Sequence, residues 1–162
     1  MKYLNIIALA ALFLAAACGT FRQTPEEQKK VAQIVRDRLD RREFTIDIDY
    51  MIPLRGRSKS VDSFSITLDG DILNSSLPYF GVVHNVPYGG GNGLSFKEKI
   101  SDYSEVESGP DKRVVVIKVK TDEDTFVYTI TVFDNGTADV HVNCRERDDI
   151  SYRGTLRTRD DE

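Results

Sequence analysis

The chain has 162 residues, with 22 basic and 26 acidic side chains and a formal net charge of −4. This length corresponds to about one domain, and an acidic chain without a block of like charges lacks the clustered lysines and arginines of a nucleic-acid-binding protein. Only two cysteines are present. No disulfide framework is therefore available, and the fold must rest on a hydrophobic core.

The first 17 residues predict a secretory signal peptide. Lys2 precedes an apolar run from Leu4 to Ala17, which is shorter than the roughly 20 residues of a transmembrane helix and fits the apolar region of a signal. The small residues that end the run lead into Cys18. This arrangement resembles a bacterial lipobox, although Ala15 replaces the usual leucine, and it predicts diacylglycerol on the Cys18 thiol. The alternative is an ordinary secreted protein, cleaved near Ala17.

Lipid attachment at Cys18 predicts both the organisation and the location of the mature chain. Residues 18–23 would form a tether and residues 24–162 a single domain. Acyl chains such as palmitate would supply the membrane contact. Because Gly19 is not the aspartate that retains lipoproteins at the inner membrane, we expect an outer-membrane lipoprotein facing the periplasm. We expect no cofactor, and the identity of a protein or small-ligand partner stays open.

The stretch after the tether predicts an amphipathic helix. Thr24 is a capping residue, Pro25 occupies the first helical position, and Glu27 completes a capping box. Apolar residues recur at helical spacing, and arginines crowd the last turns, where the helix dipole favours cations. A solvated helix end is favoured over an anion site for these arginines. The apolar residues are Val31, Ile34, Val35 and Leu39, and the arginines are Arg36, Arg38, Arg41 and Arg42.

From Glu43 onward the apolar residues alternate with polar ones, which is typical of strands with one buried face. Short strands joined by turns such as Asp69-Gly70 predict an antiparallel meander. We therefore predict an α+β, mainly β domain, in which an N-terminal helix packs on a curled meander of about eight strands, either a partly open barrel or a sandwich. The first predicted inner face consists of Phe44, Ile46, Ile48, Tyr50 and Ile52, and a later one of Ala138, Val140, Val142 and Cys144.

Several motifs in this order make the chain similar to a known family. They are "PLRGRS", "LPYFG", "PYGGGNGLSF", "SDY", "DEDTFVYTITVFDNGTADV" and "ISYRGTL". Together they resemble domain-of-unknown-function family 4251, over roughly Glu43 to Leu156. The resemblance implies a signal-bearing, single-domain envelope protein with a mostly β domain. It implies no activity, ligand or catalytic residue.

The segment from Leu77 to Phe96 contains five of the eleven glycines. It is not a phosphate-binding loop, because no lysine follows the glycines and because antiparallel strands provide no βαβ unit. Two interpretations remain open. The aromatic residues either fold over one end of the sheet as a lid, which we favour, or line a mouth for a ligand.

The residues with which this loop could recognise a partner form the candidate binding surface. Arg55 and Arg57 stand beside a glycine and could bind a carboxylate or a lipid phosphate, although we favour pairing with acidic side chains of neighbouring strands. The candidate surface comprises Tyr79, Phe80, His84, Tyr88, Arg55 and Arg57.

The sequence contains few residues of the types used for catalysis and metal binding. His84 and His141 are the only histidines, and no Cys or His cluster has zinc spacing. The acidic turn at 122–124 is interpreted as simply a polar turn rather than a calcium site. We therefore expect no catalytic residue and no metal. The predicted function is a non-catalytic envelope lipoprotein that binds or scaffolds through the Leu77–Phe96 loop. A carrier of a lipid, sugar or peptide with an apolar cavity is the first alternative, and an envelope hydrolase the second.

Overall fold

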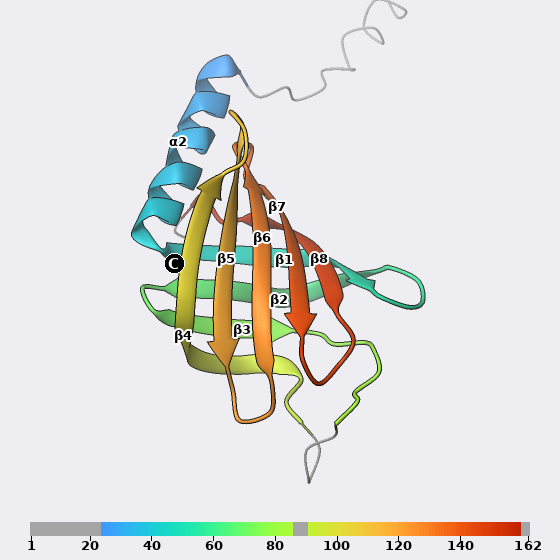
Figure 1. The fold of residues 1–162 in the computed structure, drawn as a ribbon. Coiled ribbons are helices and arrows are strands. Elements are labelled where there is room, and N and C mark those ends of the chain that lie inside the picture. The colour runs from blue at the N-terminus through green and yellow to red at the C-terminus, as the bar shows by residue number, and fades with distance from the viewer. Residues whose placement is uncertain (1–23, 86–90, 160–162) are drawn as a thin grey trace, which may run out of the picture.

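The computed structural model describes residues 24–85 and 91–159, as one helix and eight strands (Figure 1). The predicted signal peptide and tether, including Cys18, lie outside these residues. In chain order the elements are α2 (Pro25–Arg41), β1 (Glu43–Pro53), β2 (Lys59–Asp69), β3 (Ile72–Leu77), β4 (Leu94–Glu107), β5 (Lys112–Lys120), β6 (Thr125–Phe133), β7 (Thr137–Cys144) and β8 (Ile150–Leu156).

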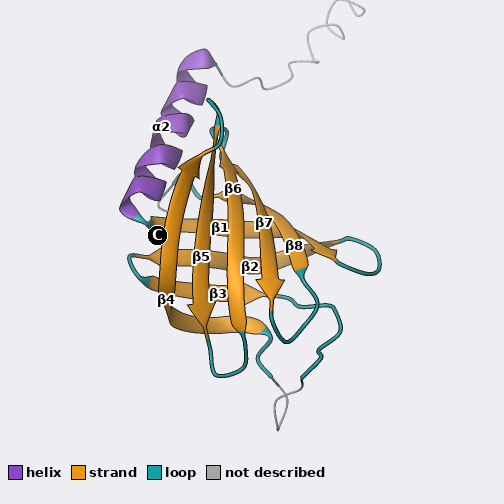
Figure 2. Ribbon diagram, in the orientation of Figure 1, coloured by secondary structure: helices purple, strands orange, loops and turns teal. Residues whose placement is uncertain are grey.

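The strands form a closed antiparallel barrel. Each strand pairs with the next in the chain, and β8 returns to pair with β1, from Ile46↔Leu156 to Pro53↔Ile150. Figure 2 shows the strands wrapping round on themselves, with the helix against one side. The predicted α+β, mainly β fold with an N-terminal helix and about eight antiparallel strands is confirmed. Closure goes one step further than the partly open barrel that the sequence suggested.

Side chains from all eight strands fill the barrel. Burial alternates along β7, where Ala138, Val140 and Val142 point inward as predicted. Near the middle of the barrel, Ile66, Ile117 and Ile130 are fully buried and belong to one hydrophobic cluster with the other inward-facing residues. This cluster is large enough to explain how the domain folds without a disulfide.

The inner face of β1 departs from the predicted alternation. Tyr50 is 39% exposed whereas its neighbour Met51 is 5% exposed, so the prediction that Tyr50 faces the core is wrong. The cause is a register shift between Ile48 and Tyr50 against both β2 and β8. A bulge inserts an extra residue and so reverses which side chains point inward. The facing strand carries Ser63 with a φ of 65°.

The helix begins and ends as predicted. The Thr24 side chain and Glu27 form a reciprocal capping box, and Arg42 ends the helix in a left-handed conformation. Val35 and Leu39 are the buried residues of its inner face. No helix in the described parts of the chain is long and apolar enough to cross a membrane.

The predicted arginine cluster at the end of α2 is spread around the barrel. Arg36 Nη2 lies 2.7 Å from Asp134 Oδ2 on the β6–β7 turn. The Arg42 guanidinium lies 4.2 Å from the ring centroid of Tyr103 in β4. Because Arg36 contacts a turn and Arg42 contacts strand β4, these two cations fasten the helix to different parts of the barrel and do not converge on one anion.

Among the described glycines, Gly154 of β8 has the least room for a side chain. A Cβ there would clash with the carbonyl oxygen of Asp47 in β1. We therefore expect G154A to lower the free energy of unfolding by about 3 kcal/mol, as overpacking does when backbone must shift. Denaturant titration followed by circular dichroism measures the change. T155A, on an exposed residue of the same strand, is the matched control. A loss at G154A no larger than at T155A would contradict the assignment of this contact.

Candidate functional site

One end of the barrel gathers most of the residues that the sequence singled out. We call it the loop end. It is formed by residues 54–58, 78–85, 91–93, 121–124 and 145–149, which connect or flank the strands there. Helix α2 lies at the opposite end and along the side (Figure 1).

A buried ion pair lies at the centre of the loop end. The side chains of Arg147 and Asp124 are 3% and 0% exposed, and Arg147 Nε donates to Asp124 Oδ2 over 3.0 Å. The guanidinium also lies 5.4 Å from the ring centroid of Tyr79 and 5.5 Å from that of Phe126. Since a buried charge is costly unless it is paired and hydrogen-bonded, this pair must be kept intact for the end to stay closed.

Asp124 also ties two connections together through backbone groups. Its Oδ1 accepts hydrogen bonds from the N–H groups of Thr125, Arg145 and Glu146, at 2.7, 3.0 and 3.1 Å. The carboxylate thereby joins the β5–β6 turn to the β7–β8 connection. The predicted polar turn at 122–124 also has a structural role, because the 145–147 backbone folds over Asp124 and buries it.

The described part of the glycine-rich segment closes this end as a lid. The Tyr79 hydroxyl donates to the carbonyl oxygens of Val82 and Asp148, each at 3.1 Å. Burial raises the pKa of Tyr79 to about 12, so this hydroxyl keeps its proton at neutral pH. Val83 forms a β-bridge with Arg147. The Tyr152 hydroxyl from inside the barrel donates to the carbonyl oxygen of Pro78 over 2.7 Å.

The last three residues of the predicted loop, Leu94–Phe96, belong to strand β4. β4 begins at Leu94, which is fully buried, so the connection is shorter than the Leu77–Phe96 segment proposed from the sequence. The Phe96 ring stacks on Phe126 with centroids 5.3 Å apart. A hollow of about 320 Å³ lies between the two arms of the connection, bounded by residues that include Tyr79, Gly93 and Leu94.

Asp148 brings together His84 and Arg55, two further residues of the candidate surface. Its side chain is 6% exposed; Oδ1 lies 3.3 Å from His84 Nε2, and Oδ2 lies 4.0 Å from Arg55 Nε. Oδ2 also accepts the N–H of Val82 at 3.2 Å. The expected pairing of Arg55 with an acidic neighbour is therefore present, although the partner is in a connection rather than a strand.

Large apolar side chains are exposed around this carboxylate. Leu54, Phe80 and Val82 are 62%, 51% and 48% exposed. Phe80 contacts the hairpin tip, because a Cβ on Gly56 would lie 3.6 Å from its ring, and Lys59 Nζ lies 5.0 Å from its centroid. We call this surface the tip patch; it consists of Leu54, Arg55, Arg57, Lys59, Phe80 and Val82. Tyr88, the other predicted member of the binding surface, lies outside the described residues.

The second histidine takes part in a separate network on the outer face of the barrel. His141 Nδ1 lies 2.8 Å from Ser151 Oγ, and Nε2 lies 3.2 Å from Asn143 Nδ2. Asn143 in turn donates to Asp149 Oδ2 over 2.8 Å. All of these hydrogen bonds are at exposed positions. The network joins β7 to β8 on an open surface.

Cys144, at the end of β7, is half-buried and packs against the core as predicted. Burial raises the pKa of its thiol to about 12, and the nearby carboxylates of Asp124 and Asp149 act in the same direction. Because the thiolate is the reactive form of cysteine, this thiol is unsuited to nucleophilic catalysis.

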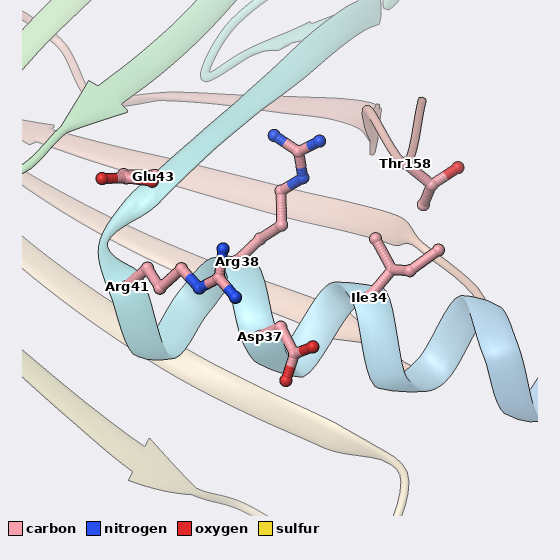
Figure 3. A pocket seen from close by; sticks show the side chains of 6 residues that line it. All are labelled: Ile34, Asp37, Arg38, Arg41, Glu43 and Thr158. Atoms are coloured by element: carbon pink, nitrogen blue, oxygen red, sulfur yellow. The ribbon is translucent and has the colours of Figure 1, made fainter. Parts of the chain in front are cut away.

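A second hollow, of about 420 Å³, lies beside the helix (Figure 3). Charges of both signs line it: Arg38 and Arg41 project from α2 together with Asp37, and Glu43 stands at the start of β1. An anion would meet two carboxylates as well as two guanidinium groups here. The hollow therefore offers no net charge for a strong anion site.

Comparisons with known proteins agree on one family. The sequence matches the family described as Domain of unknown function (DUF4251) over residues 25–156. A crystal structure of a DUF4251 family protein from Bacteroides eggerthii DSM 20697, at 1.95 Å resolution, is similar with a TM-score of 0.60 and 13% identity, over 79% of this chain and 87% of that chain. At this identity the likeness shows the fold. No curated protein matches.

The buried ion pair generates a prediction about stability. We expect D124A to lower the free energy of unfolding by about 3 to 5 kcal/mol, since it removes the closer carboxylate of the Arg147 cation, leaving Glu123 at 3.5 Å, and the acceptor of three backbone N–H groups. Exchanging both residues, as D124L with R147M, is expected to recover part of this loss. D122A in the same turn, where the side chain is exposed, is the control and should change stability by no more than about 0.5 kcal/mol. Equal effects of D124A and D122A in denaturant titrations would refute the role assigned to the pair.

Proposed function

The chain belongs to the family described as Domain of unknown function (DUF4251), and from the loop end we propose that it is a non-catalytic envelope lipoprotein that binds a partner with the tip patch. In this proposal Cys18 carries the lipid and holds the protein at the outer membrane, on the periplasmic side. The barrel is a rigid support, and residues 54–59 and 80–82 make the contact.

The observation that carries the proposal is the exposure of the tip patch. Leu54, Phe80 and Val82 are exposed on two connections that meet at Gly56 and Asp148. The cations Arg55, Arg57 and Lys59 lie in the same hairpin as Leu54. Exposed apolar groups with polar surroundings are typical of interaction surfaces. Their positions are also well defined, because Asp148 fixes Val82 and Lys59 covers the Phe80 ring.

The position of the helix supports a contact directed away from the membrane. Pro25 lies beside the β4–β5 and β6–β7 turns, with Asp111 and Asn135 around the same hollow. A six-residue tether from Cys18 spans at most about 20 Å, which is less than the roughly 30 Å length of a nine-residue strand such as β5. A lipid at Cys18 would therefore hold the helix end nearer the membrane than the loop end.

The alternative functions receive less support from the described residues. Hollows of about 130 to 540 Å³ occur around the rim and the outer face of the described chain, and none is lined by Ile66, Ile117 or Ile130 in the middle of the barrel. A carrier would need its cavity there. A hydrolase that used one of these histidines would need it in a cleft, whereas His84, 3.3 Å from Asp148 Oδ1, is 57% exposed and His141 lies on an open face.

Lipid attachment can be tested directly. Mass spectrometry of the protein purified from bacterial membranes is expected to show an acylated Cys18 at the N-terminus of the mature chain. C18S should release the protein into the soluble envelope fraction, since the acyl chains are its membrane contact, while leaving the circular dichroism spectrum of the domain unchanged. A free, unmodified N-terminus at or near residue 18 would refute the anchor.

Partner binding can be tested with a cross-linker placed in the tip patch. A photoreactive amino acid in place of Leu54 is expected to capture one discrete partner in intact cells, and F80E combined with V82E should reduce the captured amount at least tenfold. V106E is the matched control, because Val106 is 59% exposed at the opposite end of the barrel. Undiminished capture in the F80E/V82E protein, with its stability unchanged, would refute binding by the tip patch.

A further inference from the structure

The outer edge of β2 lacks a strand partner next to the tip patch. β3 pairs with β2 only from Ser65 onward, through Ser65↔Ser76 to Asp69↔Ile72. Lys59, Ser60 and Phe64 pair with β1 on one side, and the register shifts across residues 61–63 between them. Within residues 24–85 and 91–159 no strand pairs with the other side of residues 59–64. Such an edge presents backbone N–H and C=O groups on which another chain can form hydrogen bonds.

The barrel has a second protruding edge, on β4, and this one is covered by the helix. β4 extends past its last pairing with β3, Ile72↔Lys99, and there the helix comes against it. The Tyr103 hydroxyl contacts the carbonyl oxygen of Leu39 over 3.4 Å, and Arg113 joins Asp40 of the helix to Glu105 of β4. Helix α2 thus covers one of the two protruding edges, while the edge of β2 stays open.

Charge and apolar surface at the open edge define what it can accept. Lys59 starts the edge and adjoins Phe80, Arg57 and Arg55 precede it, and Asp62 stands three residues further along. The Lys59 end therefore favours carboxylates beside apolar side chains, and the Asp62 end disfavours them. The bulge at Ser63 limits the regular part of the edge to a few residues.

We infer that the open edge of β2 takes up a short extended segment of a partner protein as an added strand, with acidic and apolar side chains of that segment on the tip patch. This inference rests on the proposed function and specifies its mode. Backbone hydrogen bonds to residues 59–62 would supply part of the affinity, and the cations and Phe80 would select the sequence, as in other cases of strand addition.

A protein segment fits this surface better than a sugar does. Phe80 is the only large aromatic residue among the exposed side chains of the tip patch, and Lys59 already lies over its ring. The aliphatic Leu54 and Val82 offer no flat face for a sugar. An extended peptide can use both the aliphatic side chains and the backbone edge.

The experiment uses two synthetic peptides, one of four Glu-Val repeats and one of four Lys-Val repeats, with the complete domain. The Glu-Val peptide is expected to bind at least tenfold more tightly by NMR titration, and at saturation to slow amide exchange in residues 59–62 at least tenfold. A Glu-Val peptide N-methylated at alternate residues cannot donate those hydrogen bonds and should bind at least tenfold more weakly. K59E should lose the preference for the acidic peptide, and V106E should retain it.

The outcomes separate this inference from the function on which it rests. Equal binding of the methylated and unmethylated peptides, or protection confined to residues outside 59–62, would overturn strand addition and leave the tip patch as a binding surface. Strand addition would also be overturned, and the tip patch kept as a binding surface, if neither peptide binds while the cross-link at Leu54 still captures a partner. Dimerisation of the domain through residues 59–62, seen by sedimentation, would also overturn it, because the occupant would then be a second copy.

Discussion

The structure depends on the pairing of its first strand with its last. Ile46 and Leu156 are aligned in adjacent strands although 110 positions separate them in the chain, and only this contact turns a meander of hairpins into a barrel with a sealed interior. Such long-range pairing requires the whole chain to be ordered before it contributes. The absence of a side chain at Gly154 permits the required approach to Asp47. Every buried side chain of the barrel relies on that closure to be kept from water.

The two ends of the barrel are closed by different physical means. At one end a locally stable helix, with its own capping box, lays Val35 and Leu39 against the core. At the other end connecting segments cross the opening, and the Arg147–Asp124 pair satisfies the backbone groups they bury. At this second end the ion pair and its hydrogen bonds hold loops in place rather than a helix. It therefore positions Phe80 and Val82 on a rigid base while leaving them exposed, which is what a recognition surface needs.

Much of this fold could be predicted because the signals are local. The helix cap, the period-two strands and the Asp69-Gly70 turn each depend on residues within a few positions of one another. Tyr50 was placed on the wrong face because the bulge follows from pairing with two distant strands, and alternation alone does not reveal an inserted residue. The burial of Asp124 could not be predicted for a related reason. The sequence of a polar turn is the same whether its side chains contact water or the backbone of residues 145 and 146.

The candidate surface was predicted in part. The sequence predicts Tyr79, His84 and Arg55 as parts of one surface, and the structure brings them together around Asp148, a residue that no local pattern distinguishes. The open edge of β2 could not be seen at all, because the strand that ends early is β3 and the edge belongs to its neighbour.

The half-buried thiol of Cys144 has a consequence for the proposed export of the chain. If the other cysteine is blocked by lipid, Cys144 has no partner in its own chain. An unpaired cysteine usually invites scrambled covalent dimers wherever disulfides are being made. With its pKa raised to about 12, almost none of this sulfur is in the form that attacks a disulfide at neutral pH. If the chain is exported as proposed, burial at the end of β7 thus keeps this cysteine from attacking disulfides in an oxidising environment.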